Sequence, residues 1–361
     1  MARIKIGVLT FHRCINYGSY WQARCLVEGL RSLGADALLL DHFSRRVCLA
    51  EWKCSYRPTL PTAVPRSDMR SYRTKVRKFF DCFEQLPLSK KFRLDAPDES
   101  GTYDVVVIGS DEVWNLYHPW YGKCGIFFGE GLRAKRLVSY AASFGNYPCE
   151  YGLNEPWSQL LSRFSAISVR DDNSRDLVRT STGSEPEIVL DPCLQFPLEP
   201  DERESIPITS NYAAVYGHNF SPEFITSIRS WARKRNMRLV SIGYRNNWAH
   251  KQWLTADPHD FANFIGRAKA VITNFFHGCV FALRNLKPFV CEAAPYRHNK
   301  LTSLMNTIGG ERHLVHASAV EQSYIDVLDN PLEPSISANI DRLRMRSTRY
   351  LNTAIPAQVS L

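Results

Sequence analysis

Short apolar runs and segments with helical spacing alternate along the chain, which predicts an α/β fold. Residues 3–9 form an apolar run typical of a buried strand, and residues 22–33 carry apolar side chains at helical spacing. Gly34 is a common helix stop, and residues 37–40 form a second apolar run. This order predicts a βαβ unit with parallel strands and a right-handed crossover.

Four more strands are predicted in the first half of the chain, and each ends in small or charged residues. Their apolar runs cover residues 103–110, 137–142, 166–169 and 188–190. In a doubly wound sheet, the carboxyl ends of the strands line the crevice that binds ligands. The candidate site residues at these strand ends are Ser110, Asp111, Ser143 and Arg170.

A second α/β unit follows a proline-rich stretch. Residues 192–207 hold four prolines and many charges, which is typical of an interdomain linker. Beyond it, strands are predicted over 212–216, 239–242 and 271–273, and helices over 224–234, 260–268 and 280–285. A last helix over 337–352 is expected to pack back across the first domain. The predicted organisation is an N-terminal domain over 1–195, a second domain over 208–335, and a C-terminal helix and tail over 336–361.

The richest motif in the second unit is a histidine beside a glycine. His277 and Gly278 follow the predicted strand 271–273, after Asn274 and two phenylalanines. Histidine is the side chain that titrates nearest neutral pH, and glycine lets a ligand approach the backbone. This pattern favours a proton carrier at the crevice, and the alternative is a packed turn.

The loop between the first strand and the first helix is a second candidate site. It contains Asn16, Gly18 and Ser19, whose backbone N–H groups could face an anion at the helix N-terminus. The alternative is a plain N-cap turn. His12, in the same loop, is either a second proton carrier or an exposed loop histidine.

The charge balance indicates acidic partners. The net charge is +9, and nine of the lysines and arginines lie between residues 66 and 93, against three acidic residues. A basic amphipathic helix of this kind is either a solvated face or a peripheral contact to a membrane surface or an anionic glycan. No nucleic-acid-binding module is visible in the sequence, so nucleic acid is not an expected partner.

Cysteine spacing and hydropathy limit the remaining classes. The ten cysteines include no C-x-x-C pair, and no clustered carboxylate or histidine set suggests a metal, so no essential metal is expected. No apolar run approaches the length that spans a bilayer. The simplest compartment is a reducing cytoplasm, and the inner membrane surface is an alternative through the basic segment.

Seven segments together resemble the polysaccharide pyruvyltransferase family. They occur in the family's order between about residues 4 and 305, and the most specific is the Phe276-His277-Gly278 block, with its helix ending in Lys287-Pro288-Phe289. The other segments are 7–19, 103–115, 139–145, 167–171, 189–192 and 299–304. The resemblance implies a GT-B-like fold and a reaction that moves the pyruvyl group of phosphoenolpyruvate onto two sugar hydroxyls. A ketal and phosphate are the products, phosphoenolpyruvate is a co-substrate, and no cofactor is needed.

The resemblance also implies roles for individual residues. His277 would carry the proton or contact phosphate, and Arg170 would clamp an anion; its alternative is an ion pair with Asp171 or Asp172. Asp111 would orient the acceptor hydroxyl or cap a helix. The expected substrate-binding residues are Asn16, Gly18, Ser19, Ser110, Ser143, Asn274, Gly278, Arg297 and Lys300.

One departure keeps other functions open. Phe275 stands where family members carry serine or arginine, so the polar group there is missing or supplied elsewhere, for instance by Asn274. The acceptor would be a sugar, a glycan or a lipid-linked precursor. The alternatives are a GT-B-like glycosyltransferase, a small-molecule tailoring transferase, and a non-catalytic homologue that binds a glycan or an anion. The sequence leaves regiochemistry and oligomeric state open.

Overall fold

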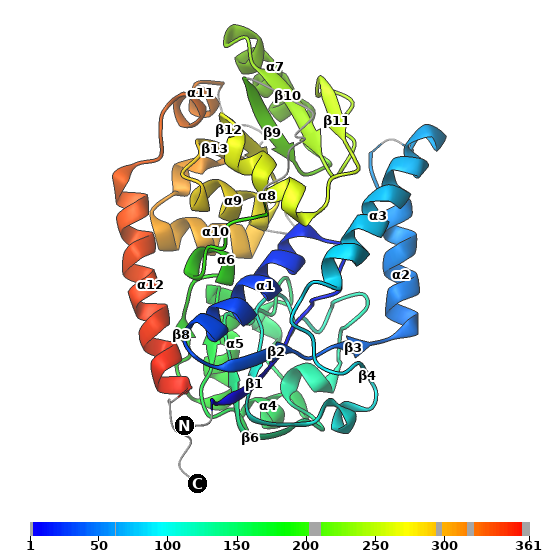
Figure 1. Ribbon diagram of the computed structural model, residues 1–361. Helices are drawn as coiled ribbons and strands as arrows, with labels where there is room; N and C mark the ends of the chain where they lie inside the picture. Colours follow the sequence, from blue (N-terminus) through cyan, green and yellow to red (C-terminus); the bar gives the residue numbers. More distant parts are fainter. Residues whose placement is uncertain (1–2, 62, 202–210, 294–297, 316–320, 356–361) are drawn as a thin grey trace.

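The computed structural model describes residues 3–61, 63–201, 211–293, 298–315 and 321–355. Two parallel β-sheets, each covered by helices, lie one above the other in Figure 1. The lower sheet comes from the first half of the chain and the upper sheet from the second half. The long helix α12 (Pro334–Ala354) runs down one side, and α2 (Arg45–Tyr56) and α3 (Met69–Phe83) stand on the other.

The N-terminal sheet has the strand order β2-β1-β5-β6, with all neighbours parallel. These strands are Asp36–Leu39, Lys5–Leu9, Thr102–Ile108 and Arg133–Ser139. Single bridges from Val138 and Ala142 extend it toward β7 (Ser168–Val169), which pairs with β8 (Glu187–Ile188). A two-stranded ribbon, β3 (His42–Phe43) and β4 (Phe92–Arg93), adjoins the edge strand β2 through a single bridge between Leu39 and Leu88. The remaining helices of this half are α1 (Tyr17–Ser32), α4 (Trp157–Leu161), α5 (Asp172–Thr182) and α6 (Pro192–Gln195).

The C-terminal sheet has the strand order β11-β10-β9-β12-β13-β14, again all parallel. Its strands are Lys251–Trp253, Arg238–Ile242, Tyr212–Tyr216, Ala270–Thr273, Phe289–Glu292 and Leu314–Val315. The chain reverses direction across the sheet at β9, as in doubly wound folds. The helices are α7 (Pro222–Lys234), α8 (Pro258–Arg267), α9 (Phe276–Arg284), α10 (His298–Ile308) and α11 (Glu321–Asp329).

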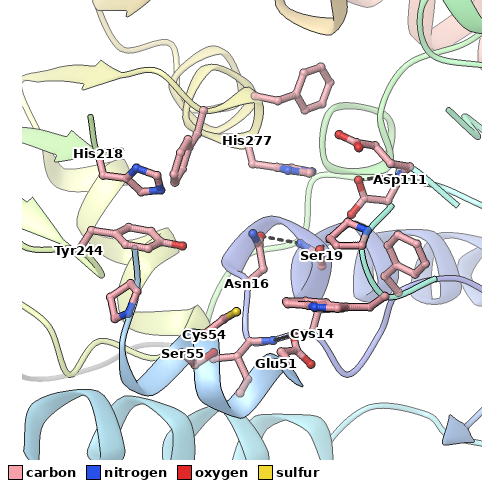
Figure 2. A pocket seen from close by; sticks show the side chains of 18 of the residues that line it. Cys14, Asn16, Ser19, Glu51, Cys54, Ser55, Asp111, His218, Tyr244 and His277 are labelled. Carbon is pink, nitrogen blue, oxygen red and sulfur yellow. Dashed lines mark hydrogen bonds between the residues drawn. The ribbon is translucent and has the colours of Figure 1, made fainter. Parts of the chain in front are cut away.

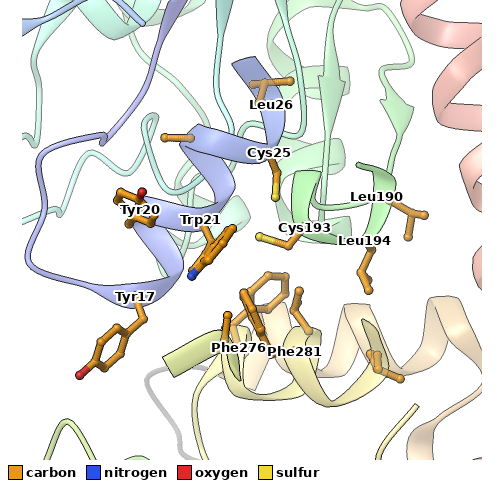
Figure 3. Close-up of a cluster of buried hydrophobic side chains, with 14 of the residues drawn as sticks. Tyr17, Tyr20, Trp21, Cys25, Leu26, Leu190, Cys193, Leu194, Phe276 and Phe281 are labelled. Atoms are coloured by element: carbon orange, nitrogen blue, oxygen red, sulfur yellow. The ribbon is translucent and has the colours of Figure 1, made fainter. Parts of the chain in front are cut away.

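Helix α1 joins the two halves. Figure 3 shows Trp21 and Cys25 of α1 beside Cys193 of α6 and Phe281 of α9, in one buried cluster. The indole of Trp21 donates a 2.8 Å hydrogen bond to the carbonyl oxygen of Pro258, at the start of α8. Apolar contact and hydrogen bonds therefore hold the two sheets in a fixed relation on this side.

Helix α12 returns from the second half to the first. The hydroxyl of Tyr350 donates to the carbonyl oxygen of Ser139 at 2.7 Å, and Leu190 N–H donates to the hydroxyl of Ser347 at 3.0 Å. The same helix also lies against α10. The predicted fold class is confirmed: two Rossmann-like domains face each other across a cleft, and the C-terminal helix packs back on the first.

The main differences from the sequence pattern lie at element boundaries. Helix α1 begins at Tyr17, well before the predicted residue 22, because the side chain of Asn16 caps it. Residues 192–195 of the predicted linker instead form α6, and all four of its residues are buried. Residues 202–210 of that linker lie outside the described residues.

Candidate active site

A cavity of about 450 Å³ lies where the carboxyl ends of strands from both sheets meet. Residues that follow β1, β5, β9, β10 and β12 line it: Phe11, Asp111, Glu112, His218, Tyr244, Phe275, Phe276 and His277. Figure 2 shows Asn16 below His277 near the middle of the cavity, with Tyr244 and His218 toward one end and Asp111 toward the other. Its size and its position at the strand ends are typical of a ligand site in an α/β protein.

His277 lies in the first turn of α9, directly after β12. Its Nε2 atom lies 3.5 Å from the Oδ2 atom of Asp191. Nε2 is buried and has no hydrogen-bonding partner among the described residues. A buried polar atom without a partner is costly in a folded protein. Nε2 is directed at the buried carboxylate of Asp191, while other atoms of the His277 side chain line the cavity.

The two glycines expected to bind substrate are both tightly packed against neighbouring side chains. A Cβ atom on Gly18 would lie 2.0 Å from the Nδ1 atom of His277, so the imidazole packs directly against this glycine. A Cβ atom on Gly278 would lie 2.0 Å from the Oγ1 atom of Thr273. Gly18 thus sets the position of the histidine ring, and Gly278 lets α9 start close against β12.

Arg170 is held between two carboxylates. Its Nη2 atom lies 2.8 Å from Asp111 Oδ1, and its Nη1 atom lies 3.1 Å from Asp191 Oδ2. The guanidinium also lies 4.6 Å from the ring centre of Phe276. Burial lowers the pKa of Arg170, but the charges of Asp111 and Asp191 outweigh that effect and raise it. Of the ion-pair partners expected from the sequence, neither Asp171 nor Asp172 is the one found.

Asp111 connects this network to the cavity that it lines. The hydroxyl of Ser19 donates to its Oδ2 atom at 2.9 Å, while Arg170 binds the other oxygen. Burial raises the pKa of Asp111, but the charges of Arg170, His277 and Lys300 outweigh it and hold this pKa below its usual range. Asp111 is therefore an ionised acceptor at neutral pH, close to the imidazole of His277.

Lys300 brings a positive charge from α10 to the same wall. Its ammonium group forms an ion pair with Glu112, which also accepts a 2.9 Å hydrogen bond from Asn115. Both Lys300 and Glu112 line the cavity. The expected partner of Lys300 in donor binding, Arg297, lies outside the described residues.

The other predicted residues lie at different depths around the cavity. Asn16 lines it, and its side-chain oxygen accepts hydrogen bonds from Gly18 N–H and Ser19 N–H, as the N-cap alternative predicts. Ser143 donates to Asp171 at 2.6 Å and is fully buried. Asn274 donates to the carbonyl oxygen of His218 at 2.7 Å. Ser143, Asn274 and the buried Ser110 are not among the cavity-lining residues.

His12 lies away from the cavity. It is fully buried, and its Nε2 atom is 3.0 Å from the Oδ1 atom of Asp41. Arg13 binds the same carboxylate. The structure therefore places His12 in a buried ion-pair network of the first domain and not in an exposed loop.

Sequence reasoning missed the cavity residues of α2 and α3, among them Glu51, Tyr72 and Lys75. Glu51 accepts a 2.6 Å hydrogen bond from Ile15 N–H, and burial raises its pKa to about 7. Tyr72 and Lys75 lie on the buried face of α3, and both line the cavity. The available signal was the spacing: residues 72 and 75 fall on the same helical face as the apolar Val76 and Phe79.

One group of side chains has the composition of a metal site. Asp191, Cys193 and His277 each place a potential ligand atom within 4.8 Å of the others. Arg170 already binds Asp191, and burial raises the pKa of the Cys193 thiol well above its usual value. A protonated thiol is a poor metal ligand. The expectation that no metal is essential stays a prediction.

Comparison with known proteins decides the family. The model of the polysaccharide pyruvyl transferase family matches residues 16–293, which is most of the chain. The chain belongs to this family. Its members are described as transferases, and the matched residues include His277, Arg170 and Asp111. A comparison with curated proteins finds no significant match.

Some solved structures resemble this chain weakly over nearly its whole length. The UDP-GlcNAc 2-epimerase of Neisseria meningitidis bound to UDP-GlcNAc is 11% identical, with 95% of this chain and 99% of that chain covered and a TM-score of 0.47. An E. coli ADP-heptose LPS heptosyltransferase II is 12% identical, with 96% and 100% covered and a TM-score of 0.37. Similarity at this level carries no information on substrate.

The basic residues between 66 and 93 differ in their exposure. Within the described residues, no helix has the length and apolar character to cross a membrane. Arg66, Arg70, Arg73 and Arg77 are exposed, whereas Lys75 is buried and Lys78 forms an ion pair with Asp260. The exposed arginines keep peripheral membrane contact as a prediction, and the buried face of α3 belongs to the cavity.

Proposed function

We propose that this member of the family transfers the pyruvyl group of phosphoenolpyruvate to two hydroxyls of a sugar, a glycan or a lipid-linked glycan precursor. The products would be a cyclic ketal and phosphate. The observation that carries the proposal is the placement of His277, which lines the cavity together with the ionised Asp111 and has Asp191 3.5 Å from its Nε2 atom. The family membership supplies the reaction class.

The reaction requires two proton movements. One acceptor hydroxyl attacks C2 of the donor and the second displaces phosphate from the same carbon, so that two C–O bonds form. One hydroxyl proton ends on C3, which becomes a methyl group, and the other leaves on phosphate. A group that gives and takes a proton near neutral pH suits both steps, and histidine is the usual choice.

The residues around His277 fit supporting roles in this scheme. Asp111 is ionised and lines the cavity, so it can accept a hydrogen bond from an acceptor hydroxyl. Lys300 lines the same wall and offers N–H donors to the phosphate. Arg170 fixes Asp111 and Asp191 by ion pairs and thereby orients the two carboxylates that flank the imidazole. In this proposal Arg170 is a positioning residue and does not touch the donor.

The test is a coupled measurement on the purified full chain. The protein is incubated with phosphoenolpyruvate and a set of candidate glycans, and released phosphate and acceptor mass are recorded. A productive acceptor should gain the mass of pyruvic acid less one water, with one phosphate released for each acceptor modified. The His277→Gln variant is the matched control. Transfer from a nucleotide sugar without phosphate release from phosphoenolpyruvate would overturn the proposal in favour of a glycosyltransferase.

A further inference from the structure

Two side chains of α3, Tyr72 and Lys75, line the cavity together with the residues that follow the strands. Tyr72 and Lys75 are three residues apart, so they lie on the same side of the helix. Both line the cavity, and their exposed fractions are 1% and 5%. Neither belongs to the network around His277.

The ammonium group of Lys75 is buried without a counter-ion. It donates a 3.1 Å hydrogen bond to the carbonyl oxygen of Gly243, and it lies 5.0 Å and 4.8 Å from the ring centres of Tyr17 and Tyr244. No carboxylate within the described residues forms an ion pair with it. An ammonium has three N–H donors, and one hydrogen bond uses only one of them.

The other cations of this region differ from Lys75. Lys300 is paired with Glu112, and Arg170 with two aspartates. Glu51, which also lines the cavity, makes no ion pair with Lys75. A buried charge is normally paired, because its removal from water is otherwise uncompensated. Lys75 therefore places a buried amino group without an ion-pair partner in a cavity that a ligand can enter, and an anion bound there would favour its charged form.

Tyr72 supplies a second unsatisfied group in the same wall. Its hydroxyl is buried and donates no hydrogen bond to a described residue; the backbone of Arg245 is the neighbouring group that can donate to its oxygen. Buried hydroxyls in native proteins are nearly always hydrogen-bonded, to protein, water or ligand. A hydroxyl donor and an ammonium on one helical face suit an oxyanion, because it accepts from both.

We propose that Lys75 and Tyr72 form an anion-binding subsite of the cavity, which holds a carboxylate or phosphate group of a substrate. The subsite rests on the proposed function only in taking that anion to belong to the donor or the acceptor of pyruvyl transfer. The ring of Tyr244 lies 4.8 Å from the ammonium group and 5.5 Å from the ring of Phe275, and both rings line the cavity beside the subsite. A neutral sugar would satisfy the hydrogen bonds but not the charge.

The test uses three variants of the full chain. Lys75→Met removes the charge at nearly constant volume, and Tyr72→Phe removes only the hydroxyl. Arg73→Met is the matched control, because Arg73 is exposed on the same helix. Binding of phosphoenolpyruvate, inorganic phosphate and glucose 1-phosphate is measured by calorimetry. Melting temperatures without ligand check that each variant is folded, and Lys75→Met should melt no lower than the wild type.

Lys75→Met should bind at least one of the three anions about 10- to 100-fold more weakly, as expected for a hydrogen bond to a charged group. Tyr72→Phe should lose less, and Arg73→Met should bind like the wild type. Weaker binding of phosphoenolpyruvate assigns the anion to the donor, and weaker binding of glucose 1-phosphate alone assigns it to the acceptor. Equal affinities of wild type and Lys75→Met for all three anions, or no binding by the wild type, would overturn the inference.

The same variants separate this inference from the proposed function. If phosphoenolpyruvate is turned over and Lys75→Met leaves the KM values of both donor and acceptor unchanged, the proposed reaction stands and the subsite does not. If Lys75→Met loses phosphate binding while the wild type releases no phosphate from phosphoenolpyruvate, the subsite stands and the donor does not.

Discussion

Replacement of Arg170 by methionine should destabilise the protein by about 3–5 kcal/mol, the range for breaking a buried ion pair by removing one partner. The side chains of Arg170 and Asp191 are 2% and 1% exposed, so water cannot compensate for the lost charge. Asp111 loses its 2.8 Å partner at the same time. Methionine fills similar space, which limits any cavity term.

The stability that Arg170→Met loses should depend on pH in a defined direction. In the wild type the pKa values of Asp111 and Asp191 are lowered, so these carboxylates contribute stability above their unfolded pKa near 4 that is lost as pH falls through the folded values. Without Arg170 the pKa of Asp111 loses its largest lowering cause, and the pKa of Asp191, which His277 lowers more strongly, loses a smaller one. The difference in unfolding free energy between wild type and Arg170→Met should therefore be largest near pH 7 and shrink below about pH 4.

Urea unfolding at several pH values measures this difference directly. Arg175→Met is the control, because Arg175 is partly exposed and forms surface ion pairs that contribute at most about 1 kcal/mol. Arg170→Lys should fall between wild type and Arg170→Met. The double variant Arg170→Met/Asp191→Asn should recover part of the loss. An Arg170→Met protein within about 1 kcal/mol of wild type at pH 7 would refute the buried-network reasoning.

Three further predictions concern the cavity. His277→Ala and His277→Gln should each lose about 100- to 10,000-fold in turnover with little change in melting temperature, and a largely active His277→Gln would reduce the histidine to a hydrogen-bond donor. Gly18→Ala should impair turnover about as strongly, because its Cβ would lie 2.0 Å from the imidazole, whereas Gly266→Ala, in helix α8, should not; equal activity of the two variants would contradict the packing argument. Burial lowers the pKa of Lys75 to about 7, so between pH 7 and 10.5 the unfolded chain binds a proton there that the native chain does not, and stability should rise with pH by at most about 5 kcal/mol. Lys75→Met, followed by denaturant unfolding over the same range, should lack this rise; an identical profile would mean that Lys75 is hydrated.

The strand-end residues show what the sequence could predict. Each strand that leads to a candidate residue could be predicted from its apolar run. Ligands bind at the carboxyl ends of such strands, and Asp111 and His277, which follow two of them, both line the cavity. The partners of Arg170 were not predictable in the same way. Asp171 is the N-cap of α5, where its side chain accepts a hydrogen bond from Ser174 N–H, while Arg170 meets aspartates from two other loops.

Lys75 shows a second limit. In the sequence it is one of nine basic residues between 66 and 93, and charge counting treats them alike. Its burial depends on α3 packing against the second domain, where Gly243 and Tyr244 meet it. A contact between residues that are about 170 positions apart has no local signature in the chain.

The return of α12 makes the first domain discontinuous in sequence. Tyr350 and Ser347 complete hydrogen bonds of β6 and of the segment after β8, although more than 150 residues separate them. During synthesis, the face of the N-terminal domain that α12 covers therefore stays exposed until residues near 350 have been made. The two halves should consequently finish folding together. A fragment that stops after the first sheet would expose the apolar surface that α12 covers, and such a surface promotes aggregation.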